Sequence, residues 1–413
     1  MSFGRRTLNA AGWQTWIGVF RLSVGLVRFV VLARILAIET FGEFGLATAV
    51  VGLSIVVPRF GLTAAFLHRG PQTRDEEPAA SVLFTLRLGL MVAWAVVIVP
   101  FAVVFLDGGV RTAVLVIAVC QLIAEPAYVP RLLHIRRLYY PRIAFVESLS
   151  VVIGTVAAVA LAWSGAGLWA LLAPSVIHAV LEDLVFLGPG SAWRPCVVFN
   201  REVTRYLLGF GSRNLLAGFF DVVIEKVPEL WTGIAFGTAR LGIYNRAARF
   251  VSFPRRVTVD PLVSVLPARF SELKERPRDF GSTLVNALSA VGIGGGLLAI
   301  ALWATAPWMI ETLIGARWMP VVSPFRILVA LVVLEPIRLT LSSALVALGE
   351  PGRAAWIRGS QAVVLVPAVW IGAALAELEG VAAAVVLSSA IGVVALVLQM
   401  WQRSPASAWI GRS

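Results

Sequence analysis

The residues best suited to chemistry are arginines that interrupt long apolar runs. Arg21 and Arg28 lie seven residues apart in the first run, and Arg59 lies in the second. Seven residues are about two helical turns, so Arg21 and Arg28 share one helix face. An arginine in the middle of a membrane costs about 2.5–3.5 kcal/mol on insertion scales, so each needs a partner or a water-filled cavity. The guanidinium fork binds phosphate in a bidentate manner, so these three residues predict an anion-binding cavity.

The second half of the chain carries further charges inside apolar runs. Arg213, Arg255 and Arg256 are additional candidates for the anion site. The acids that could bind a coupling ion are Asp221, Glu225 and Asp260. Glu335 and Arg338, three residues apart beside a proline, are expected instead to form a structural ion pair, and Glu125 before Pro126 is expected to be paired in the same way.

Composition indicates that these charges lie in a membrane protein. Hydrophobic residues make up 59% of the 413 residues and charged residues 14%, against about 45–50% and about 25% in soluble domains. The two cysteines and three histidines show no metal-ligand spacing, so we expect neither a metal nor a cofactor. The net charge of +12 fits loop arginines and an anionic ligand better than nucleic acid.

Hydropathy predicts an all-α polytopic membrane protein with about twelve transmembrane helices. The predicted spans cover residues 10–34, 43–66, 80–106, 111–133, 143–163, 166–187, 206–236, 239–268, 283–308, 322–346, 354–375 and 380–401. The seventh span contains Glu225-Lys226-Val227-Pro228-Glu229, which should break, kink or face water. Prolines 254, 261 and 267 indicate that the eighth span is bent.

Loop charges predict the orientation. Arginines such as Arg131, Arg136, Arg137 and Arg142 are counted in one set of loops. The opposite set is mainly acidic and holds Glu39, Glu43, Asp107, Glu311, Glu377 and Glu379, with Arg240 and Arg317. Because positive charge stays in the cytoplasm, both termini are expected there.

An internal repeat divides the chain into two six-helix bundles. FGEF at 41–44 is matched by LGIY at 241–244, Glu125-Pro126 by Glu335-Pro336, and Pro141 by Pro351. We expect an N-terminal lobe (1–187), a cytoplasmic linker (188–205) and a C-terminal lobe (206–413). Six spans per half make the repeats parallel, with a cavity between them, as in alternating-access carriers.

Several motifs resemble the bacterial Wzx-type polysaccharide flippases, in the colanic-acid-exporter-like branch of the MOP superfamily, which has a MATE-like fold. They are LARIL (32–36), FGEFGL (41–46), GLTAA (61–65), LGIYNRA (241–247), LPARFS (266–271), LIGARW (313–318) and ALGEP (347–351). The resemblance implies a non-enzymatic flippase that moves an undecaprenyl-pyrophosphate-linked oligosaccharide across the bacterial inner membrane for polysaccharide or lipopolysaccharide export. It also implies contact with membrane lipids and with polysaccharide polymerase machinery.

Two other functions remain open at this point. An ion-coupled multidrug or cation antiporter of the same superfamily would use the acids of the second half. A membrane glycan transferase would need larger outer loops bearing acids or histidines.

Overall fold

The computed structural model describes residues 3–59, 61–68, 76–191 and 193–403. Throughout these ranges the regular structure is helical, with no strand. The chain divides into two compact units, Met1–Val222 and Val223–Ser413. The lobe and linker boundaries expected from the sequence stay a prediction.

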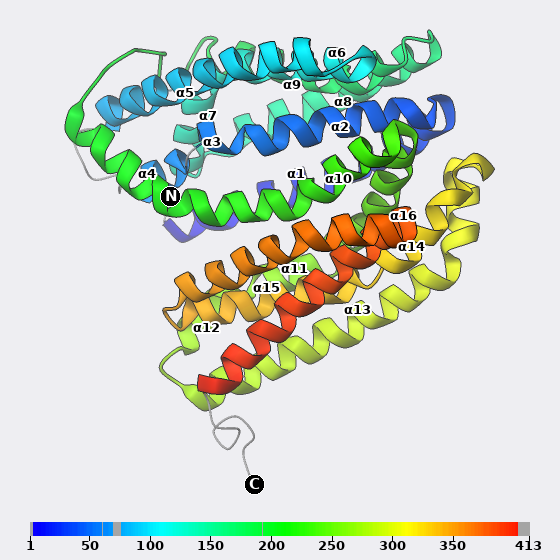
Figure 1. The fold of residues 1–413 in the computed structure, drawn as a ribbon. Helices are drawn as coiled ribbons and strands as arrows, with labels where there is room; N and C mark the ends of the chain where they lie inside the picture. Colours follow the sequence, from blue (N-terminus) through cyan, green and yellow to red (C-terminus); the bar gives the residue numbers. More distant parts are fainter. Residues whose placement is uncertain (1–2, 60, 69–75, 192, 404–413) are drawn as a thin grey trace. The chain divides into compact units, whose positions relative to one another are not determined.

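In the first unit, five long helices run alongside one another: α2, α5, α6, α8 and α9 (Figure 1). The elements are α1 (Phe3–Ile35), α2 (Ile38–Ser54), α3 (Val56–Arg59), α4 (Leu62–His68), α5 (Glu76–Phe105), α6 (Gly108–Ile123), α7 (Glu125–Arg136), α8 (Pro141–Trp163) and α9 (Leu168–Phe186). Helix α1 packs on α8, and α8 packs on α9. Gly154 permits the close contact between α8 and α9, because a Cβ at this position would lie only 3.1 Å from the Cα of Pro174 on α9.

In the second unit, α15 packs against both α13 and α16 (Figure 1). The elements are α10 (Arg201–Thr258, which begins in the first unit), α11 (Asp260–Ser264), α12 (Leu266–Leu273), α13 (Pro277–Ile314), the 3₁₀ turn η1 (Ala316–Val321), α14 (Val322–Leu328), α15 (Leu331–Ala347) and α16 (Pro351–Arg403). Helix α16 would be about 80 Å long if straight, far more than the roughly 30 Å of a bilayer core. It breaks at Ala376 and Glu377, which lie outside the helical region.

Breaks at matching positions agree with the internal repeat. Ala37 separates α1 from α2, and Gly237, at φ 80°, interrupts α10 200 positions later. Gly108 and Gly315, both with positive φ, follow α5 and α13. Gly108 is the first residue of α6, and Gly315 directly precedes η1.

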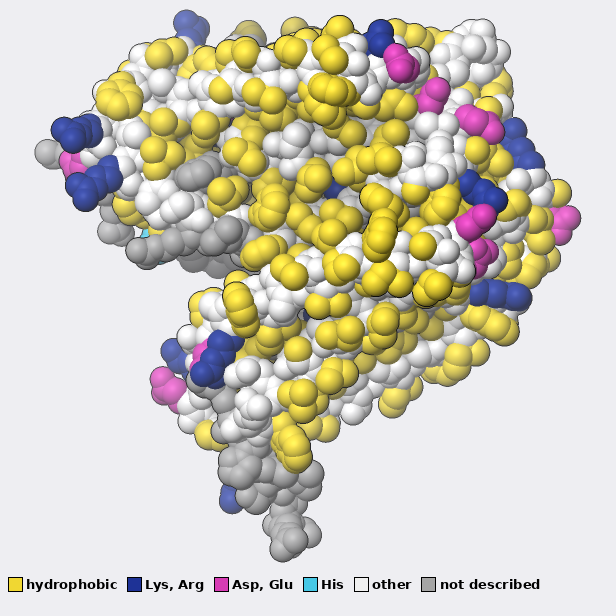
Figure 2. Space-filling model, viewed as in Figure 1, with side chains coloured by type: hydrophobic (Ala, Val, Ile, Leu, Met, Phe, Trp, Pro, Cys, Tyr) yellow, Lys and Arg dark blue, Asp and Glu magenta, His cyan; other side chains and the backbone are white. Residues whose placement is uncertain are grey.

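Apolar side chains cover the outside of the helices, and charges gather toward the helix ends (Figure 2). On α5 alone, Val96, Val97, Val104 and Phe105 are each 68–70% exposed. Seven helical segments are long and apolar enough to cross a membrane, or nine if each bent pair forms one span, within the part of the chain that the structure describes. The protein is therefore a multi-pass membrane protein, and the figure of twelve spans stays a prediction.

The seventh predicted span does not break where its charges suggested. Helix α10 continues through Pro228 and departs from helical geometry at Gly237. The charges are tolerated because Lys226 Nζ lies 3.0 Å from Glu225 Oε1 and 3.2 Å from Glu229 Oε2, while the Glu225 side chain is 67% exposed. Of the three expected alternatives, a break at these residues is not observed, and facing water stays a prediction.

The eighth predicted span is bent, as its prolines indicated. It is divided into the end of α10, then α11, then α12. Pro261 and Pro267 occupy the first turns of α11 and α12. Backbone N–H groups in a first turn have no partner within the helix, so proline costs no hydrogen bond there.

Candidate functional site

Arg21 projects from the apolar part of α1 and forms an ion pair with a buried acid. Its Nη1 lies 2.8 Å from Glu147 Oε2 on α8. The Glu147 side chain is 7% exposed, whereas that of Arg21 is 52% exposed. The Arg21 guanidinium thus lies on an apolar helix, pairs with one carboxylate and keeps about half of its side chain exposed.

Glu147 is shared with a second arginine in a network that joins four helices. Arg131 of α7 lies 2.6 Å from Glu147 Oε1 and 3.2 Å from Glu182 Oε1 on α9. His178 Nε2 is 3.6 Å from Glu182 Oε2, and its Nδ1 is 3.1 Å from Ser150 Oγ. Two arginines face two glutamates, so Glu147 does not belong to Arg21 alone.

Arg59 lies beside a second, fully buried ion pair. Arg87 of α5 binds Glu125 of α7 with two parallel bonds, Nε to Oε1 at 2.5 Å and Nη2 to Oε2 at 2.9 Å. The Arg87 guanidinium also lies 3.5 Å from the Tyr128 ring centroid. Arg59, exposed at the end of α3, is within electrostatic range of Arg87, Tyr128 and Glu125. The expected pairing of Glu125 is confirmed, with Arg87 as its partner.

Arg28 lies on the same helix as Arg21, two turns along, with a half-buried side chain. Because an α-helix has 3.6 residues per turn, the helical geometry of α1 confirms that the two arginines share a face.

In the second unit, two of the predicted residues form a pair. Arg255 Nε lies 3.3 Å from Asp260 Oδ1 across the break between α10 and α11. Arg256 is exposed, and so are Asp221 and Glu225 earlier on α10. The side chain of Arg213 lies outside the described residues.

Glu335 and Arg338 pair on α15, as expected. Arg338 Nη2 is 2.9 Å from Glu335 Oε2, and Ser389 of α16 donates to Glu335 Oε1 at 3.2 Å. Gln361 continues the chain of contacts by donating to Ser389 at 3.4 Å and accepting from Arg358 at 2.8 Å. This network fastens α15 to α16.

Arg131 and His178 were missed by sequence reasoning. Arg131 was counted among the loop charges that set the orientation, but it lies inside α7 and contacts two buried carboxylates. The available signal was the presence of Glu147 and the Glu182-Asp183 pair in neighbouring apolar runs, because buried carboxylates require cations. Across the described ranges, no group of three or more His, Cys, Asp or Glu side chains is arranged to hold a metal ion.

Two relatives and one solved structure are informative. The chain is 26% identical over 313 residues to the succinoglycan biosynthesis transport protein ExoT of Rhizobium meliloti (strain 1021), covering 74% of this chain and 62% of that protein. It is 20% identical over 389 residues to the lipopolysaccharide biosynthesis protein WzxC of Escherichia coli (strain K12), covering 92% and 78%. The match thus spans less than two thirds of the length of ExoT.

The structure of the lipid II flippase MurJ in an inward closed conformation superposes with a TM-score of 0.74 at 13% identity, covering 96% of this chain and 88% of that one. At this identity the likeness shows the fold alone, which is that of MOP-superfamily transporters. The model of the family described as "Polysaccharide biosynthesis protein" matches residues 31–323, well over half of the chain. The chain therefore belongs to the polysaccharide biosynthesis protein family.

Proposed function

We propose that this protein is a flippase that moves an undecaprenyl-pyrophosphate-linked oligosaccharide from the inner to the outer leaflet of the bacterial cytoplasmic membrane. The halves would alternate in access, both termini would lie in the cytoplasm, and no bond of the substrate would be made or broken. Support comes from family membership, from relatives named for polysaccharide transport and biosynthesis, and from the MOP fold.

The observation that carries the proposal is the geometry of Arg21. A half-exposed guanidinium on an apolar helix is expensive unless water or an anion reaches it. Its counter-ion, Glu147, is divided between Arg21 and Arg131. A diphosphate carries more charge than one shared carboxylate, and a guanidinium binds phosphate bidentately, so it would compete well for Arg21.

The other candidates take roles consistent with their positions. Arg28 and the exposed Arg59 would extend the phosphate contact within the first unit. Arg213 at the end of the first unit, and Arg255 and Arg256 in the second unit, would supply further positive charge. Asp221, Glu225 and Asp260 stay candidates for ion coupling, with Glu225 beside Lys226 and Asp260 beside Arg255.

The first test is the lipid-linked glycan pool in a strain lacking this protein, quantified by mass spectrometry beside the surface polysaccharide. We expect undecaprenyl-pyrophosphate glycan to accumulate while the surface polysaccharide disappears. An unchanged lipid pool and a normal surface, in a strain without a second flippase, would refute the proposal. Export of a cationic dye by the protein would then favour the antiporter.

The second test is complementation of that strain with alanine variants of Arg21, Arg28 and Arg59. Turnover should fall in at least one variant while the protein stays in the membrane at the wild-type level. Arg111→Ala is the matched control, because Arg111 is a partly exposed arginine of the same unit that pairs with the exposed Asp107. Wild-type turnover in all three variants would remove the first-unit arginines from the mechanism.

A further inference from the structure

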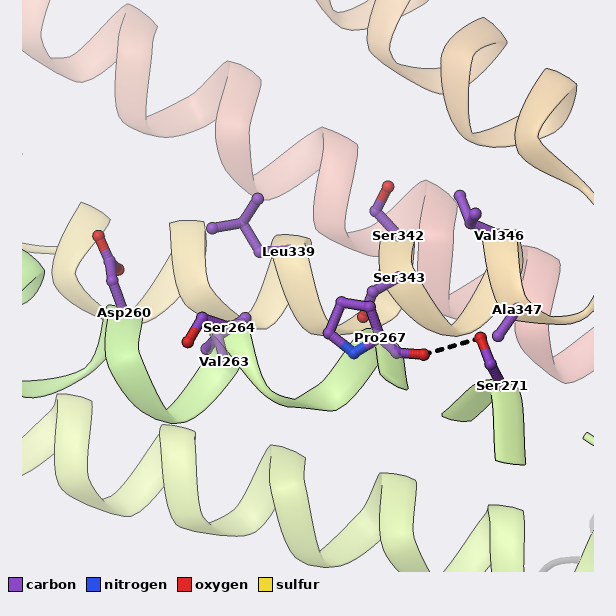
Figure 3. Close-up of a pocket in the computed structure, with 10 residues that line it drawn as sticks. All are labelled: Asp260, Val263, Ser264, Pro267, Ser271, Leu339, Ser342, Ser343, Val346 and Ala347. Atoms are coloured by element: carbon purple, nitrogen blue, oxygen red, sulfur yellow. Dashed lines mark hydrogen bonds between the residues drawn. The ribbon is translucent and has the colours of Figure 1, made fainter. Parts of the chain in front are cut away.

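A pocket of about 460 Å³ opens in the second unit where α11 and α12 face α15. Figure 3 shows Asp260, Ser264, Pro267 and Ser271 along the broken helix, with Leu339, Ser342, Ser343 and Val346 of α15 opposite. Val263 and Ala347 complete the lining. Its volume lies within the range of about 300–1,000 Å³ that is common for small-molecule sites.

The broken helix supplies the polar groups of this pocket. Because α11 and α12 restart at prolines, their short segments present Ser264 and Ser271 beside α15. Each of these serines donates its hydroxyl to a carbonyl of its own helix: Ser264 to Pro261 at 2.7 Å, and Ser271 to Pro267 at 2.9 Å. Ser343 donates to Thr340 at 2.8 Å in the same way.

These bonds determine what the pocket offers a ligand. A hydroxyl that donates to its own helix keeps its oxygen lone pairs, so it presents an acceptor. The Asp260 carboxyl group offers acceptor oxygens too, and its Oδ1 lies 3.3 Å from Arg255 Nε. The lining is thus rich in acceptors, and none of its ten residues is Lys, Arg or His.

The lining chemistry distinguishes between ligand classes. A diphosphate is unsuitable because the lining residues provide no cation for it. A single metal ion is unsuitable because Asp260 is the one carboxylate in a pocket of this size. A sugar ring fits, because its hydroxyls donate hydrogen bonds and its C–H faces pack on apolar side chains such as Pro267, Leu339 and Val346.

We propose that this pocket binds a sugar residue of the transported glycan, with Asp260, Ser264 and Ser343 accepting hydrogen bonds from its hydroxyls. The proposal rests on the proposed flippase function and assigns the sugar part of the substrate to the second unit. The lipid diphosphate would be bound elsewhere.

The test measures the affinity of the purified full-length protein, in lipid nanodiscs, for two probes. One is undecaprenyl diphosphate without sugar, and the other is the undecaprenyl-diphosphate glycan that accumulates in the deletion strain. The wild-type protein should bind the glycan lipid more tightly. Ser343→Leu should weaken glycan-lipid binding at least tenfold and leave the Kd for the sugar-free lipid unchanged.

Two further variants distinguish a loss of sugar binding from misfolding of the protein. The double variant Ser264→Ala and Ser343→Ala adds no bulk and should shift the Kd ratio in the same direction by a smaller factor. Ser282→Leu on α13 is the matched control, because Ser282 is an exposed serine with the same kind of bond, to Asp279 at 3.0 Å, and lies outside the pocket.

The outcomes separate the two proposals. Equal binding of both probes by the wild type, or an unchanged Kd ratio in Ser343→Leu and in the double variant, would overturn the sugar pocket and leave the flippase standing. Failure of the wild type to bind either probe would overturn the flippase proposal and the pocket assignment with it.

Discussion

Removing the carboxylate of Glu125 tests how strongly the buried Arg87–Glu125 pair stabilises the first unit. The two side chains are 5% and 4% exposed and share two short bonds. Glu125→Gln leaves the Arg87 charge buried without its counter-charge. Breaking one side of a buried pair typically costs about 3–5 kcal/mol.

This loss should be visible as a large change in thermal stability. For a unit of roughly 200 residues, each kcal/mol corresponds to about 2–4 °C, so we expect the Tm to fall by roughly 6–20 °C. The assay is thermal unfolding of the purified protein followed by tryptophan fluorescence. The double variant Arg87→Leu and Glu125→Leu should recover most of the loss, since no unpaired charge remains.

Asp107→Asn is the matched control for the single variant. Asp107 also pairs with an arginine of its unit, Arg111 at 2.6 Å, but its side chain is 96% exposed, so water can replace the contact. We expect no measurable change in Tm. A Tm shift of less than about 2 °C in Glu125→Gln, or a double variant less stable than Glu125→Gln, would refute the view that the buried Arg87 charge requires its partner.

Three further changes have defined outcomes. Glu147→Gln removes the carboxylate shared by Arg21 and Arg131 and should lower the stability by about 1.5–3 kcal/mol in the same assay; an unchanged Tm would show that this network contributes nothing net. Gly372→Ala places a Cβ 2.3 Å from the backbone oxygen of Gly380, in the facing segment of α16, and should lower the yield of folded protein. In the control Gly294→Ala, the added Cβ meets nothing within 4 Å, so this variant should fold normally. Equal yields of the two variants would count against this close packing. Gly237→Ala puts a side chain at φ 80° and ψ 176°, a backbone region essentially restricted to glycine, and should cost about 1–3 kcal/mol in chemical unfolding; a neutral result would argue against the break in α10.

The helices could be predicted from the sequence because the signal for a membrane span is local. The spans predicted at 80–106 and 143–163 correspond to α5 at Glu76–Phe105 and α8 at Pro141–Trp163. The bend of the eighth span was equally predictable, since Pro261 removes a backbone donor wherever it lies in a helix.

The side-chain partnerships were harder to predict because they depend on helix rotation and depth. Arg21 and Glu147 are 126 positions apart, and nothing in the sequence states that α1 packs on α8. Arg131 was counted as a loop arginine that keeps its loop in the cytoplasm, but its guanidinium forms ion pairs with Glu147 and Glu182. The pocket beside α15 likewise depends on the angle between short helices, which apolar periodicity does not specify.

The Arg87–Glu125 pair also sets a requirement on the order of biosynthesis. Glu125 is made 38 residues after Arg87, which is about 2–8 s at ribosomal rates of roughly 5–20 residues per second. If the segment that becomes α5 enters the bilayer during that interval, its arginine enters without a counter-charge, and the mean hydropathy of 2.6 in its apolar stretch favours insertion. The α6–α7 segment, bent by 54° just before Glu125, then delivers the missing charge as it follows through the translocon. We therefore expect Arg87 to enter the membrane before the carboxylate that neutralises it.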